Sequence, residues 1–174
     1  MQINPAHWHL LINHFPIILS IVGTLFLGLG LALSKNTLKT SGLLLLIFGA
    51  LTAIPANQTG EGAEETVEAI PGVTQNGIDV HEDAASTGLI IILITGGIAL
   101  ITSLIQVKYP KQAKLMFIAT LLAGITSAGF MSYVGLTGGE IRHTEIRGDI
   151  NIGGTAKATD TPVNINSEAD DDGD

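Results

Sequence analysis

Apolar stretches almost free of charge alternate with short polar segments along this chain. The apolar stretches cover residues 15–33, 41–54, 84–107 and 113–134. A helix needs roughly 20 apolar residues to cross about 30 Å of hydrocarbon, and three of the four stretches reach that length. They lack the polar stripe at 3.6-residue spacing that is typical of helices in soluble bundles. The pattern therefore predicts an all-α integral membrane protein, a bundle of four spanning helices.

The second stretch, residues 41–54, is the shortest, and Pro55 interrupts it. It crosses a bilayer only if the helix continues through residues 56–58, if the bilayer thins, or if the bundle shelters its end. Four spans remain the best interpretation of the pattern.

The polar segments predict further elements and the domain boundary. Asn4 and Pro5 suit the N-cap and first position of a helix, so the first helix is expected to begin before its apolar run. Residues 59–68 predict a short amphipathic helix on the outer face, with Glu61, Glu65 and Glu68 on one side. Residues 1–150 form the transmembrane domain, and residues 151–174 are predicted to be a disordered acidic tail.

Charge is divided between two sides of the predicted membrane. Two connections carry lysines and no acid; they hold Lys35, Lys39, Lys108, Lys111 and Lys114. All 16 acidic residues fall on the other side. Short lysine-rich loops stay in the cytoplasm. We therefore expect a multi-pass protein of the bacterial inner membrane with both termini periplasmic or extracellular, and the net charge of −8 argues against nucleic acid as a partner.

The two helical hairpins resemble each other at their ends. Each begins with a histidine at the outer end of a helix, His14 in the first half and His81 in the second. Each returns outward to a similar phrase, Thr-Gly-Glu at residues 59–61 and Thr-Gly-Gly-Glu at residues 137–140. The halves run in the same direction, so a pseudo-symmetry axis would lie along the membrane normal. Chance is the alternative, because these residue types are common at helix ends.

All five histidines are predicted to lie at the outer boundary of the membrane, beside carboxylates. His14, His81 and His143 form the core of the candidate site, and His7 and His9 are expected to be peripheral. Pro16 removes the hydrogen bond that its N–H would give to the Ile12 carbonyl, so a kink is expected near His14.

Three interpretations of this cluster stay open. In the first, His14 pairs with His81 or His143 to bind a b-type haem for electron transfer, with a redox partner protein on the outer face. In the second, a transition metal ion is bound by imidazole and carboxylate ligands; the candidates are His14, His81, His143, Glu61 and Glu65. In the third, the histidines are interfacial polar residues and helix caps of a structural membrane subunit.

The sequence contains no catalytic constellation. An H-E-x-x-H zinc motif is missing because Ala85 stands where the second histidine belongs, and no serine or cysteine nucleophile motif occurs. Without cysteine, covalent c-type haem attachment is excluded. The chain is therefore expected to be a binding or structural protein rather than an enzyme, with a membrane component of a quinone oxidoreductase as a third class.

Several phrases carry a resemblance to a known family. They are residues 9–16 (HLLINHFP), 59–65 (TGEGAEE), 71–73 (PGV), 81–85 (HEDAA) and 138–143 (GGEIRH). In that order they resemble a bacterial membrane-protein family catalogued as domain of unknown function 2231. The resemblance implies a four-helix membrane domain, sometimes associated with Rieske or cytochrome c modules. Arg142 stands where the family usually has tyrosine, which implies a different branch.

Overall fold

The described chain is entirely helical. In the computed structural model, residues 4–143 and 146 are described, and no strand occurs among them. The helices are α1 (Pro5–Ile12), α2 (His14–Ala32), α3 (Asn36–Gln58), α4 (Gly60–Val67), α5 (Gln75–Lys108) and α6 (Ala113–Arg142). Four helical segments are long and apolar enough to cross a membrane, with α1 and α2 counted as one. This confirms the all-α class and the multi-pass character, whereas the predicted tail, residues 151–174, lies outside the described residues.

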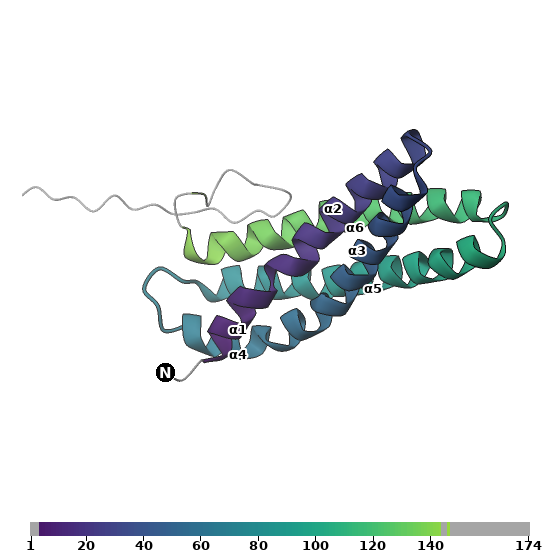
Figure 1. Ribbon diagram of the computed structural model, residues 1–174. Coiled ribbons are helices and arrows are strands. Elements are labelled where there is room, and N and C mark those ends of the chain that lie inside the picture. The colour runs from purple at the N-terminus through teal and green to yellow at the C-terminus, as the bar shows by residue number, and fades with distance from the viewer. Residues whose placement is uncertain (1–3, 144–145, 147–174) are drawn as a thin grey trace, which may run out of the picture.

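The spanning helices form a closed ring of neighbours. α2 packs on α3, α3 on α5, α5 on α6, and α6 on α2. The turns that join α2 to α3 and α5 to α6 lie at one end of the bundle, and α1 and α4 lie at the other (Figure 1). We call the first the lysine end, because both turns carry lysines, and the second the histidine end. At the lysine end, the ammonium of Lys39 lies 5.1 Å from the centre of the Phe117 ring.

The distribution of side chains suits a lipid environment. Large apolar side chains such as Leu104 and Leu115 cover the outside, and they are 65% and 73% exposed. The buried positions are rich in glycine, alanine, serine and threonine. In lipid, helices associate through close packing of small residues rather than through the hydrophobic effect.

The second span is complete because α3 continues through Pro55. It runs for 23 residues to Gln58, which meets the condition set by the sequence. The hydroxyl of Thr59 donates to the Pro55 carbonyl at 2.9 Å and to the Ala56 carbonyl at 3.0 Å. The Pro55 carbonyl also accepts from the Thr59 N–H at 3.1 Å, so Thr59 closes the end of the helix with both its backbone and its side chain.

Two helix starts explain how the histidine end is built. Asn4 caps α1 as predicted, and its side chain accepts from the N–H of His7 at 3.0 Å. The chain is interrupted at Asn13, between α1 and α2, near the kink expected from Pro16. α5 begins at Gln75 with Thr74 as its N-cap, so the prediction that His81 starts the third spanning helix was wrong.

α4 forms at the predicted place, after the end of α3, and lies against α1. A Cβ atom on Gly62 would lie 2.5 Å from Cβ of Pro5, so the backbones of these helices are in close contact. The segment after α4 turns at Gly72, whose φ of 87° is accessible to glycine at little cost.

The closest approach between α2 and α3 also depends on glycine. A Cβ atom on Gly42 would lie 2.6 Å from the Leu27 nitrogen and 2.8 Å from the Gly23 oxygen. Both neighbours are backbone atoms and cannot rotate away. Gly97 on α5 is the opposite case, because nothing described lies within 4 Å of its Cβ position.

We predict that Gly42→Ala lowers the free energy of unfolding by about 1–3 kcal/mol, because the added methyl forces α2 and α3 apart. Gly97→Ala is the matched control and should leave stability unchanged or raise it slightly, since alanine favours helix. Thermal unfolding followed by circular dichroism in detergent measures both. Equal stability of the two variants would contradict the close contact.

Candidate functional site

His9 on α1 is held against the end of α3. Its Nδ1 lies 3.0 Å from the Ala56 carbonyl oxygen and 3.3 Å from the Thr59 hydroxyl. The ring is half-buried, and a Cβ atom on Gly60 would lie 4.0 Å from its Cε1. The contact therefore fastens the first, short helix of the chain to the first hairpin.

His81 on α5 is held against the end of α6 in the same way. Its Nδ1 lies 3.1 Å from the Thr137 hydroxyl. The ring is half-buried. A Cβ atom on Gly138 would lie 3.0 Å from its Cε1, so this glycine leaves room for the imidazole.

We call each of these arrangements, a histidine ring bonded to the threonine of a Thr-Gly phrase, a seat. The two seats have corresponding parts. In each, a threonine donates to the carbonyl three residues earlier: Thr59 to Ala56 at 3.0 Å, and Thr137 to Val134 at 3.0 Å. In each, a histidine Nδ1 bonds to that threonine, and a glycine follows the threonine; His9 bonds in addition to the Ala56 carbonyl. The structural counterpart of His81 is therefore His9, not His14 as the sequence comparison of the halves had it.

Hydrogen-bond chemistry fixes which ring nitrogen carries the proton. A carbonyl only accepts, so Nδ1 of His9 must donate to Ala56. The single hydroxyl proton of Thr137 is donated to Val134, so Nδ1 of His81 must donate to Thr137. In each neutral ring, Nε2 therefore carries the lone pair. An imidazole anchored through Nδ1–H with its Nε2 lone pair available is the form that binds metals.

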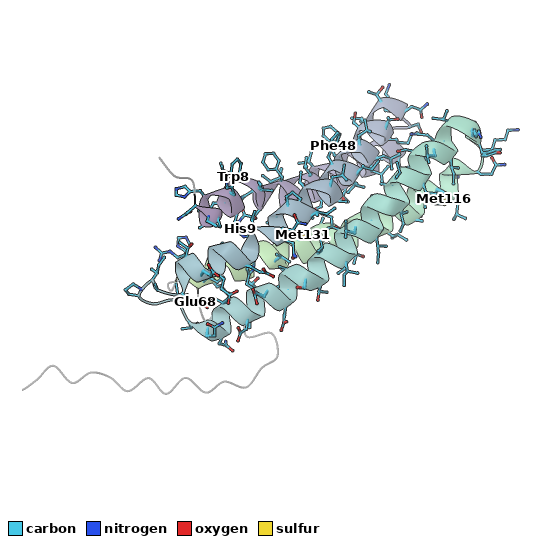
Figure 2. The ribbon with its side chains drawn as sticks, turned by 90° about the horizontal axis from the view of Figure 1, so that it is seen from below. Trp8, His9, Phe48, Glu68, Met116 and Met131 are labelled. Carbon is cyan, nitrogen blue, oxygen red and sulfur yellow. The ribbon has the colours of Figure 1, made fainter. Side chains whose placement is uncertain are left out.

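His9 belongs to the first half of the chain and His81 to the second, and both are held by a threonine at the histidine end. His9 lies at the same end of the molecule as Glu68, far from Met116 at the lysine end (Figure 2).

The other residues predicted for the site are more exposed. The exposed His14 side chain places Nδ1 3.4 Å from the Leu10 oxygen within its own helical segment, and it is an electrostatic neighbour of His9. His143 is exposed at the C-cap of α6. Glu61 and Glu65 are exposed on α4.

Acidic side chains gather beside the seats, between α4 and the first turns of α5. The amide of Gln75 donates to Asp79 at 3.0 Å and to Glu64 at 3.4 Å. The nearby carboxylates of Glu64, Asp79 and Glu61 raise the pKa of Glu82 above its usual value. This group ties α4 to α5.

This arrangement gives little support to the interpretation of the histidine cluster as a metal site. Within the described ranges, no three histidine, aspartate or glutamate side chains lie close enough together to hold a metal ion. His14, His81, His143, Glu61 and Glu65 are thus not assembled there into one ligand set.

His9 is the site residue that the sequence analysis left at the periphery. The repeated Thr-Gly phrase is the sequence feature that marks His9, because one histidine is hydrogen-bonded to the threonine of each phrase. Comparisons with known protein families, with curated proteins and with solved structures found no match for the chain. The resemblance to domain of unknown function 2231 therefore stays a prediction.

We predict that Thr137→Val lowers the free energy of unfolding by about 1 kcal/mol, because it leaves the His81 Nδ1–H without that acceptor. Thr126→Val is the matched control; Thr126 is an exposed residue of α6 whose hydroxyl bonds only within its own helix. Thermal unfolding in detergent compares the two. A larger loss in Thr126→Val than in Thr137→Val would argue against the seat.

Proposed function

We propose that this membrane protein binds a b-type haem through His9 and His81 and transfers electrons at its histidine end. One observation carries the proposal: two imidazoles at the histidine end, one from each half of the chain, are anchored through Nδ1, which leaves Nε2 as the nitrogen with the lone pair. A pair of neutral imidazoles from different helices is the donor set that b-type haem requires. When bound, haem iron supplies reversible one-electron transfer.

The residues around the rings would fix how the imidazoles meet the haem. Thr59 and Thr137, with the carbonyl of Ala56, orient the rings and hold the Nδ1 protons in place. Such partners of a ligand histidine commonly affect metal affinity by about 10- to 100-fold. His14, next to His9, is the alternative ligand from the first half.

A structural subunit without a cofactor is the second candidate. Its support is that each seated histidine joins two helices, α1 to α3 and α5 to α6. Hydrogen bonds across helices stabilise membrane bundles by themselves. Under this alternative, the seats matter for stability and not for ligand binding.

Haem content distinguishes the two candidates. Protein purified from haem-replete cells should show a Soret band, with a spectral change on dithionite reduction. His9→Ala and His81→Ala should each lose most of the haem, whereas His7→Ala should keep it, because His7 is exposed and bonds to the N-cap Asn4.

His14→Ala separates the proposed pair from the alternative one. If His9 and His81 are the ligands, this variant keeps the wild-type spectrum. Loss of haem in His14→Ala with retention in His9→Ala would transfer the role to His14. A wild-type protein without a Soret band would remove the haem proposal and leave the structural one.

We further propose that the histidine end faces the periplasm or the exterior, with the lysine end in the cytoplasm of a bacterium. The support is the division of charge: lysines occupy both turns at one end, and the described acids lie at the other. A redox partner protein would then meet the histidine end, and the resemblance to domain of unknown function 2231 agrees with a role beside redox modules.

The chain lacks cysteine, so single-cysteine variants report orientation directly. We expect Thr66→Cys on α4 to react with a membrane-impermeant maleimide in intact cells, and Thr37→Cys at the lysine end to react only after lysis. Both positions are exposed. The reverse labelling pattern would invert the proposed orientation.

A further inference from the structure

The inside of the bundle carries a series of hydroxyl groups. The buried hydroxyl-bearing residues are Ser20, Thr24, Thr95, Thr102, Thr120, Ser127 and Thr137. Most of them are satisfied by helix carbonyls or by each other; the hydroxyls of Thr102 and Thr120, for example, lie 2.8 Å apart. Hydroxyls that bond within their own helix or to its neighbour are common in membrane helices.

Ser127 differs from the others. Its side chain is 0% exposed, and its Oγ has no hydrogen-bond partner among the described residues. A buried hydroxyl left without a partner costs free energy, because it has lost its bonds to water and gained none. Buried polar groups are nearly always paired, with protein or with ordered water.

The surroundings of Ser127 are both polar and small. One turn away on α6, a Cβ atom on Gly124 would lie 2.7 Å from the Thr24 hydroxyl of α2. From α5, the Thr95 hydroxyl reaches the Ala123 carbonyl at 3.3 Å. Ser127 therefore lies near the level where α2, α5 and α6 all bring oxygen atoms inward.

Two other buried side-chain oxygens also lack a partner in the described part of the chain, Oδ1 of Asn13 and Oγ of Ser103. Asn13 precedes α2 at the histidine end, whereas Ser103 follows the buried Thr102 toward the lysine end of α5. Of the three residues, Ser127 alone is fully buried.

We propose that Ser127 binds an ordered water molecule inside the bundle. Water fits because the Ser127 hydroxyl needs a partner both as a donor and as an acceptor, and one water serves for both. A cation would need several oxygen or carboxylate ligands, and no charged side chain belongs to this interior set. An apolar ligand would leave the hydroxyl unsatisfied. The inference does not rest on haem binding.

Water-edited solid-state NMR of the protein in lipid bilayers tests the proposal. Magnetisation from water should reach Ser127 about as early as it reaches Thr66, an exposed residue of α4. It should reach Ala99 late, because Ala99 is 0% exposed within an apolar cluster. Transfer to Ser127 as slow as to Ala99 would overturn the proposal.

Thermal unfolding of Ser127→Ala is an independent test, because the sign of the change in Tm depends on whether water is bound. If water is bound, removing the hydroxyl deletes hydrogen bonds and lowers Tm. If the hydroxyl is dry and unpaired, the same change removes a penalty and raises Tm, which would also overturn the proposal. Ser132→Ala sets the baseline, because Ser132 is an exposed serine of the same helix whose hydroxyl donates to the Ala128 carbonyl at 2.8 Å.

Discussion

Hydrocarbon offers no hydrogen bonds, and the architecture of this protein depends on that constraint. Every backbone group within the membrane has to be satisfied inside a helix, so the described chain is helical throughout its apolar stretches. The same constraint turns serine and threonine hydroxyls toward carbonyls of their own or adjacent helices. Attraction between helices then depends on close packing, which Gly23 and Gly42 provide where α2 meets α3.

The two seats at the histidine end also use hydrogen bonds between side chains and helix carbonyls. At the end of α3, the Thr59 hydroxyl and the His9 ring both bond to the Ala56 carbonyl. In α6 the Thr137 hydroxyl donates to the Val134 carbonyl and bonds to the His81 ring. A threonine that is bonded to its own helix thereby orients each imidazole. The two proposed roles of the histidines, stabilising the bundle and holding a ligand, thus use the same hydrogen bonds. Orientation by backbone carbonyls is also how ligand histidines are commonly fixed in metal proteins.

The spans could be predicted from sequence because length and apolarity suffice for them. Even α3 followed from the stated condition on residues 55–58. The beginning of α5 did not, since the nine residues from Gln75 to Asp83 are largely polar and only the Thr74 cap marks the start. That difference places His81 inside a helix rather than at its end.

The candidate site could be predicted only in part. The Thr-Gly phrases and His81 were recognised from sequence, but His9 was expected to be peripheral. Its ring meets Ala56 and Thr59 because α1 packs against the end of α3. Spacing along one helix cannot reveal a contact between residues 50 positions apart.

α1 and α4 contain no buried residue, although they cover the histidine end together. Segments with few buried contacts open at a lower free energy than the core they adjoin. One seat therefore lies between the well-packed helices α5 and α6. The histidine of the other seat is carried by α1, which opens at a lower free energy. Local opening of α1 at His9 would then admit the proposed haem while α2, α3, α5 and α6 stay packed together.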